Sequence, residues 1–211
     1  RIFSAEFGDA LNVVAKQIKL VITFPESVHP VKIVGLDGRV RDDRVELNYN
    51  QLYGGQEKYA IVEVALDETV AGVTKEIAQA NVTYTDATSG QSIVVASSVL
   101  AQCSAQPEKV EASLNWGVRN AWNINVNAIG YDEAIKWADK GDPKKAADIL
   151  NKSAEQLDRD GRESGDEQLI QKARLVKSQA EDIEKQGGLS KYNRKLLRAD
   201  GYQDLQQQET R

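Results

Sequence analysis

Carboxylate residues recur between Gln156 and Glu167 at the spacing of a calcium-binding loop. Four residues match its third, fifth, sixth and twelfth positions: Asp158, Asp160, Gly161 and Glu167. The first position holds Gln instead of Asp, and the eighth holds a carboxylate where an aliphatic residue belongs. The missing first ligand removes a charge that a hard cation needs. A solvated turn between helices is therefore our interpretation, and a calcium-regulated helical module is the alternative.

A second group of carboxylates lies in the segment 39–46, which contains Asp42, Asp43 and three arginines. Paired carboxylates can hydrolyse glycosides when they line a cleft that holds a sugar. Of the aromatic residues that would line such a cleft, Tyr49 and Tyr53 lie nearby in the sequence. We interpret the segment as a surface turn whose charges pair with one another.

The chain has one His and one Cys. These exclude an internal disulfide framework and a zinc site made of Cys and His alone. His29 lies in a turn beside Pro30, and Cys103 is expected to be a small buried residue. We predict no catalytic residue, no cofactor site and no metal site, so the chain is expected not to be an enzyme.

Three tryptophans, Trp116, Trp122 and Trp137, are interspersed with asparagines in one segment. We expect the tryptophans to anchor a core and the asparagines to contact the N-terminal half of the chain. The alternative is an exposed aromatic surface that binds a partner.

Hydrophobic and polar residues alternate in short runs between Lys16 and Leu100, with turn residues between the runs. This pattern predicts six or seven strands, six of which cover 18–24, 31–35, 45–49, 59–66, 72–84 and 91–100. The frequent turns favour antiparallel pairing over a parallel sheet. We predict an antiparallel, immunoglobulin-like β-sandwich over residues 1–103, without the Cys and Trp pattern of antibody domains.

The remaining residues have helical periodicity. One helix is predicted from Pro107 to about Gly141, and a second begins at Pro143 with Asp142 as its cap. A third is predicted to begin at a capping box at Ser164. A short helix over 190–198 and a frayed polar tail from Gly201 complete an α-helical hairpin or small bundle over residues 104–211. The fold class is therefore α+β with two segregated parts.

Composition limits the partners of the chain. It has 211 residues, and 27 basic residues against 32 acidic ones give a net charge of −5. No apolar run approaches about 18 residues, so we predict no membrane span. Because the net charge is negative, we also predict no nucleic-acid partner. The lone Cys103 favours a reducing compartment such as the cytoplasm. Because the chain begins with Arg1 and contains no Met, we expect it to be a piece of a longer protein.

Three segments carry a resemblance to a known family: FSAEFGDAL leading into VVAK over 3–16, LYGGQEKY over 52–59, and the helical residues 134–150. They resemble the region that follows the von Willebrand factor A domain in bacterial proteins of that class. In that family the A domain comes first, then a β-sandwich, then a helical tail. Its metal site needs an Asp-x-Ser-x-Ser run, and no such run occurs in this sequence. The resemblance therefore implies a C-terminal region that lacks the A domain itself.

The function implied is a non-catalytic protein–protein interaction or scaffolding module that accompanies a von Willebrand factor A domain. Its partner would be another protein or an upstream domain of the same chain. A carbohydrate-associated accessory sandwich of an enzyme, binding through Tyr49, Tyr53 or the tryptophans, is a further alternative.

Overall fold

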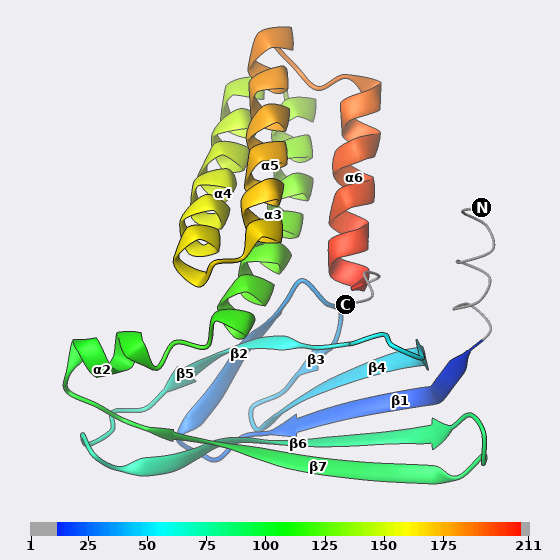
Figure 1. Ribbon diagram of the computed structural model, residues 1–211, viewed down its shortest axis with the longest axis vertical. Helices are drawn as coiled ribbons and strands as arrows, with labels where there is room; N and C mark the ends of the chain where they lie inside the picture. Colours follow the sequence, from blue (N-terminus) through cyan, green and yellow to red (C-terminus); the bar gives the residue numbers. More distant parts are fainter. Residues whose placement is uncertain (1–11, 208–211) are drawn as a thin grey trace. The chain divides into compact units, whose positions relative to one another are not determined.

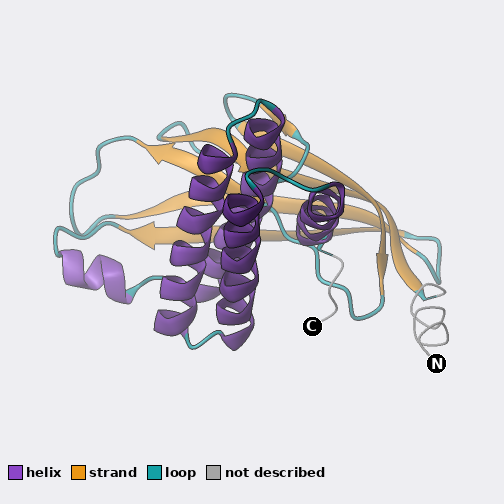
Figure 2. Cartoon of the chain, turned by 90° about the horizontal axis from the view of Figure 1, so that it is seen from above, coloured by secondary structure: helices purple, strands orange, loops and turns teal. Residues whose placement is uncertain are grey.

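The computed structural model describes residues 12–207 and consists, within that range, of seven strands followed by five helices. The chain divides into two compact units, the first ending at Ser113 and the second beginning at Leu114. Figure 2 draws the strands, all of which belong to the first unit, in orange and the helices in purple. The predicted α+β class with antiparallel strands is confirmed. The segment FSAEFGDAL (residues 3–11), which carries part of the family resemblance, lies outside the described residues.

The strands form two antiparallel sheets (Figure 1). The larger has five strands in the order β3-β4-β1-β6-β7, and the smaller pairs β2 with β5. In chain order the strands are β1 (Val13–Thr23), β2 (Val28–Val34), β3 (Arg39–Val40), β4 (Arg44–Tyr53), β5 (Ile61–Leu66), β6 (Thr74–Asp86) and β7 (Ser92–Gln102). The alternation of apolar and polar residues thus predicted six of these strands to within five residues at each end, the largest difference being the start of β1. The short strand β3 lies in the segment 39–46, which was predicted as a surface turn.

Strand β1 lies at the centre of the larger sheet and carries much of its apolar face. Leu20 pairs with Leu47 of β4, while β6 pairs with the other edge of β1. A bulge at Gln17, whose φ is +52°, sets two residues of β1 against a single residue of β6. Because the bulge shifts the alternation by one residue, Ala15 and Ile18 are both buried.

The two sheets meet at Gly38, in the loop that precedes β3. A Cβ atom at Gly38 would lie 2.5 Å from Cδ1 of Ile33 in β2 and 3.1 Å from Cγ of Leu47 in β4. The missing side chain therefore lets apolar residues of both sheets converge. Val28 and Val34 of β2 are buried as well. The finer prediction, an immunoglobulin-like sandwich, stays a prediction.

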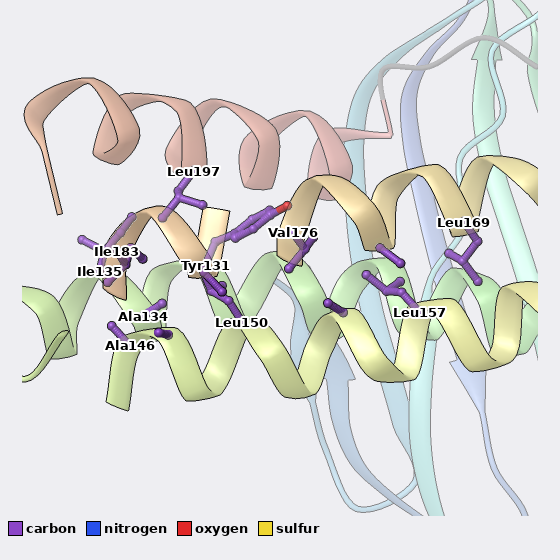
Figure 3. Packing of buried hydrophobic residues seen from close by; sticks show 14 residues of the cluster. Tyr131, Ala134, Ile135, Ala146, Leu150, Leu157, Leu169, Val176, Ile183 and Leu197 are labelled. Carbon is purple, nitrogen blue, oxygen red and sulfur yellow. The ribbon is translucent and has the colours of Figure 1, made fainter. Parts of the chain in front are cut away.

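Helices α3 to α6 share one hydrophobic core, whose side chains point toward one another in Figure 3. Its largest buried members include Tyr131 of α3, Leu150 of α4, Ile183 of α5 and Leu197 of α6. The helices are α2 (Pro107–Ala112), α3 (Trp116–Asp139), α4 (Pro143–Ser164), α5 (Glu167–Gln186) and α6 (Lys191–Gln206). Each of the four core helices thus contributes an apolar face, as the three- and four-residue spacing of these residues requires.

Capping residues set the starts of two helices where the sequence predicts them. The side chain of Asp142 accepts a hydrogen bond from the backbone N–H of Lys145 (3.0 Å), and Pro143 is the first residue of α4. Ser190 caps α6 by accepting from the N–H of Asn193 (3.0 Å). These signals are local, so they can be recognised in the sequence.

The predicted single helix from Pro107 to about Gly141 is wrong, because it is interrupted between α2 and α3. The side chain of Asn115 accepts a hydrogen bond from the backbone N–H of Val118 (3.2 Å) and caps a new helix. An Asn in a periodic run competes with the helical backbone in this way. The break also separates the two units, since Ser113 ends the first.

The predicted start of the third helix at Ser164 is also wrong. Ser164 is the last residue of α4, and Gly165 ends that helix with a φ of +71°, which favours glycine. The cap of α5 is Asp166, whose side chain accepts from the N–H of Leu169 (3.1 Å). The glycine that ends α4 lies between Ser164 and Asp166, so the new helix begins two positions later than predicted.

The predicted frayed tail from Gly201 is wrong for the described residues, because α6 continues to Gln206. Gly201 is buried. A Cβ atom there would lie 3.3 Å from Cδ2 of Tyr131 and 3.5 Å from the carbonyl oxygen of Ala128. The missing side chain therefore allows α6 to approach α3 closely. The end of the predicted tail, residues 208–211, lies outside the described residues.

The predicted solvated turn at Gln156–Glu167 is wrong for most of its length, since Gln156 to Ser164 belong to helix α4, and the same finding rules out the alternative of a calcium loop. A calcium loop makes a sharp turn at its glycine, whereas Gly161 is helical and packs against Ile170 of α5. Among residues 12–207, no three His, Cys, Asp or Glu side chains gather so that they could hold a metal ion. In the same range, no helix is both long and apolar enough to cross a membrane.

Candidate functional site

Strand β7 is the most unusual surface feature of the first unit. It spans Ser92–Gln102, contains no charged residue and no proline, and lies at the end of the five-stranded sheet (Figure 1). Four large apolar side chains on it have exposed fractions between 51% and 65%: Val94, Val95, Val99 and Leu100. In the described part of the chain, β6 is the one strand that pairs with β7. The other edge of β7 therefore presents backbone N–H and C=O groups without a strand partner.

The two faces of β7 differ in their neighbours on β6. Val95 lies opposite Val82 and Val99 opposite Ala78, so one face is apolar. On the other face, Val94 lies opposite Thr83. Apolar side chains thus stand on both faces of an exposed edge strand, where charged residues usually prevent unwanted pairing.

The opposite edge of the same sheet is protected. Strand β3 has only two residues, Arg39 and Val40, and the charged residues Arg41, Asp42 and Asp43 follow it directly. A short, charged edge is a poor template for another strand. Strand β7 is therefore the edge of the larger sheet that is suited to pairing with another strand.

A buried polar cluster lies in the second unit, between α3, α4 and the start of α5. Asp160 of α4 has a side chain that is only 5% exposed. Its Oδ2 atom accepts hydrogen bonds from Nε of Arg119 (2.6 Å) and Nδ2 of Asn123 (2.7 Å). Nearby, Nδ2 of Asn120 donates to Oγ of Ser164 (3.1 Å), so the cluster contains five polar side chains of α3 and α4.

The hydrogen bonds of this polar cluster hold helices together. Burial alone would raise the pKa of Asp160, but hydrogen bonds from Asn123 and Arg119 and the Arg119 charge lower it below its ordinary value. Nε of Arg159 lies 3.6 Å from the other carboxylate oxygen. Both oxygens thus face donors, which leaves the carboxylate poorly placed to act as a base or to bind a cation. The ion pair between Arg119 and Asp160 instead links α3 to α4 at a specific register.

The asparagines of α3 were expected to contact the N-terminal half of the chain, but the hydrogen bonds of their side chains lie within their own unit. The side chains of Asn120, Asn123 and Asn127 bond to residues of α4 and α5 of their own unit; Asn127, for example, accepts from Oγ of Ser153 (2.7 Å). Together with Tyr131 they lie on one face of α3, at intervals of three and four residues. This face is polar toward the start of α3 and apolar toward its end.

The three tryptophans are half-buried, so they are neither fully enclosed core anchors nor an open aromatic surface. The guanidinium of Arg119 lies 4.9 Å from the ring centroid of Trp122. The ammonium groups of Lys140 and Lys145 lie 4.6 Å and 3.4 Å from that of Trp137. Cation–π contacts therefore cover part of two rings.

The remaining sequence candidates each have their own neighbours. Asp43 forms two hydrogen bonds of 3.0 Å with the guanidinium of Arg44, which lowers the pKa of the carboxyl, as expected of a paired surface turn. Nε2 of His29 lies 3.0 Å from a carboxylate oxygen of Asp67 at the surface. Cys103 is half-buried rather than buried. No two of these sequence candidates are brought together within residues 12–207.

The two tyrosines considered for sugar binding do not form an exposed platform. Tyr49 is half-buried, and its hydroxyl donates to the carbonyl of Tyr59 (3.2 Å). Tyr53 is half-buried and hydrogen-bonded to Gln51. Neither ring is fully available for stacking against a sugar.

Helix α3 carries a second apolar surface, on the side away from its core residues. Val118, Trp122, Val126 and Ile129 recur at intervals of three and four residues, and all are exposed except the half-buried Trp122. A helix satisfies its own backbone hydrogen bonds, so such a stripe offers side-chain contacts alone. Strand β7 offers side chains and backbone groups together, which makes it the stronger candidate.

Comparison with models of protein families found no match, and no curated protein matches the chain. Two solved structures are similar to it. One is described as von Willebrand factor type A from Catenulispora acidiphila, with 12% identity, a TM-score of 0.55, and coverage of 80% of this chain and 41% of that one. The other is the ArnB paralog VWA2 from Sulfolobus acidocaldarius, with 15% identity, a TM-score of 0.45, and coverage of 90% and 43%. The chain spans less than half the length of either structure. The first likeness supports a von Willebrand factor A-like fold, and it conflicts with the expectation that this chain lacks the A domain itself.

Proposed function

We propose that this chain is a non-catalytic module that binds another protein through the free edge of strand β7. The observation that carries the proposal is the combination of a long, uncharged edge strand with exposed apolar side chains. An edge strand of 11 residues has no charge, no proline and four exposed large apolar side chains. Proteins normally protect such an edge, because it pairs readily with other strands. An edge that is left unprotected is best explained by a partner strand that covers it.

Strand addition would combine two kinds of contact. The partner's backbone would pair with the N–H and C=O groups of β7, and its alternate side chains would contact Val95 and Val99 on one face and Val94 and Leu100 on the other. The first kind of contact supplies affinity, and the second selects an apolar partner segment. A charged or proline-containing strand would be excluded.

We further propose that the chain works beside a von Willebrand factor A domain in a longer protein. The resemblance of its sequence segments and the length of the structure matched with a TM-score of 0.55 support this context. The sequence contains no Asp-x-Ser-x-Ser run, so we propose no metal site of that kind in this chain. We also infer that its two sheets are the layers of a β-sandwich, since Ile33 and Leu47 meet over Gly38.

The test is site-specific photo-crosslinking in the organism that makes the protein. A photoreactive amino acid at Val99, whose exposed fraction is 57%, should give covalent protein adducts. The same group at Thr88, in the exposed turn between β6 and β7, is the matched control and should give few. Equal labelling at both positions would contradict the proposal. The purified chain should also leave glycoside, ester and peptide substrates unchanged, and turnover of any of them would contradict the non-catalytic assignment.

A further inference from the structure

We propose that the partner strand is β7 of a second copy of this chain, paired antiparallel about a two-fold axis through Ser97. This inference rests on the proposed function, because it names the partner for the same edge. It follows from the order of residues in β7, which is self-complementary. The product is a symmetric dimer whose two five-stranded sheets become one continuous sheet.

The self-complementarity appears when β7 is set against itself. A two-fold axis perpendicular to the sheet keeps the same face of each copy on the same side. With Ser97 on the axis, Val95 lies opposite Val99 and Val94 lies opposite Leu100. Both faces then bring large apolar side chains together. Directly opposed pairs of this kind are what stabilise antiparallel strands.

Neighbouring registers lose this match. If the axis passes through residue 96 or 98 instead, Val95 faces Ser97 or Ala101. The axis through Ser97 is also the one that uses the whole strand, because Ser97 is the midpoint of Ser92–Gln102. Every residue of β7 then has a partner residue in the other copy.

No electrostatic repulsion opposes the pairing of two β7 strands. Because β7 carries no charged residue, no like charges come to lie opposite one another in any register. The same self-pairing of β3 at the far edge would bring arginines close together, since Arg39 lies on that strand of two residues. The charge pattern therefore selects the β7 edge for association between copies.

The extent of the contact sets its strength. Eleven residues at about 3.4 Å each give a strip about 37 Å long, and a sheet is about 10 Å thick, so the flat section is about 400 Å² on each copy. The two sides together give about 800 Å², which is less than stable interfaces bury and is in the range of weak, transient ones. We therefore expect a reversible dimer, with a dissociation constant in the micromolar range.

Sedimentation equilibrium of the whole chain tests this between about 1 and 300 µM. The wild-type mass should rise from 23.3 kDa toward twice that value with concentration. Ser97→Lys places two ammonium groups opposite each other on the axis and should raise the dissociation constant at least tenfold. Ser97→Glu should do the same. An equimolar mixture of the two variants should recover the dimer, because the opposed charges are then of opposite sign. Thr88→Lys adds the same charge to the adjacent turn and should behave as wild type.

Each outcome decides the proposal. A wild-type chain that stays monomeric at 300 µM overturns it, as does a Ser97→Lys variant that dimerises like wild type. Failure of the mixture to recover the dimer overturns the register through Ser97. Circular dichroism confirms that each variant folds, which is expected because Ser97 is exposed. If the wild type is monomeric while Val99 still crosslinks to another protein, self-pairing is wrong and the proposed function stands.

Discussion

Replacing Asp160 with Ala removes the acceptor at the centre of the polar cluster in the helical unit. Loss of one member of a buried ion pair costs about 3–5 kcal/mol, because the other charge is left buried. The Arg119 side chain is 35% exposed, so water can solvate it in the variant and the lower part of the range applies. Nδ2 of Asn123 also loses its acceptor, while the helix gains a few tenths of a kcal/mol from Ala. We expect the free energy of unfolding of this unit to fall by about 2–3 kcal/mol.

Urea denaturation followed by tryptophan fluorescence measures this effect selectively. All three tryptophans belong to α3, so the signal reports the helical unit and not the strands. Asp158→Ala is the matched control, two residues away on the same helix. Asp158 pairs with Arg162 at the surface, where water and salt screen the charges, so its loss should change the stability little. Equal losses for the two variants would refute the argument that the buried network joins α3 to α4.

The same pair of proteins has a predictable pH dependence. The pKa of Asp160 is lowered in the folded state, so the carboxylate stabilises the protein at pH values above the ordinary pKa of an Asp. As pH falls, the unfolded chain takes up a proton first, and this stabilisation is lost below about pH 4. The difference in unfolding free energy between wild type and Asp160→Ala should therefore be constant from pH 7 to pH 5 and shrink at lower pH. A difference that grows as pH falls would contradict this.

Three further changes test the packing and the metal assignment. Gly161→Ala should lower the unfolding free energy of the helical unit by about 1–3 kcal/mol, since the new Cβ would lie 2.9 Å from a side-chain carbon of α5. Gly130→Ala is the control: its nearest atom is 3.7 Å away, so it should raise the unfolding free energy by up to about 1 kcal/mol. Leu47→Ala should lower the stability of the strand unit by about 2–5 kcal/mol in a circular-dichroism melt, and Leu66→Ala, at an exposed strand end, by less than about 1 kcal/mol. Calcium added to the chain should produce no binding heat in calorimetry, because Gln156 to Ser164 are part of helix α4 and do not form a calcium loop. A saturable heat would show that this assignment is wrong.

Local signals account for the part of the fold that the sequence predicts well. Alternation identifies the strands, and the Asp142-Pro143 pair identifies the start of α4, because each depends on neighbouring residues alone. Features that depend on distant residues escape this reasoning. Gly201 was interpreted as part of a frayed tail, and its contact with Tyr131 depends on how α6 packs on α3. Asp160 was interpreted as a possible calcium ligand, and its true partner, Arg119, lies 41 positions earlier in the chain.

The sequence of β7 also contained a signal for the proposed binding edge, but the same pattern fits a central strand as well as an edge strand that gains a partner. Strand β7 has apolar residues at both odd and even positions, which is typical of a strand buried on both faces in the middle of a sheet. The structure instead places it at an edge, where those residues are exposed. A sequence suited to a central strand, found at an edge, is what we expect if the sheet continues into another molecule. The same pattern then has one physical reason, since β7 becomes a central strand once its partner is bound.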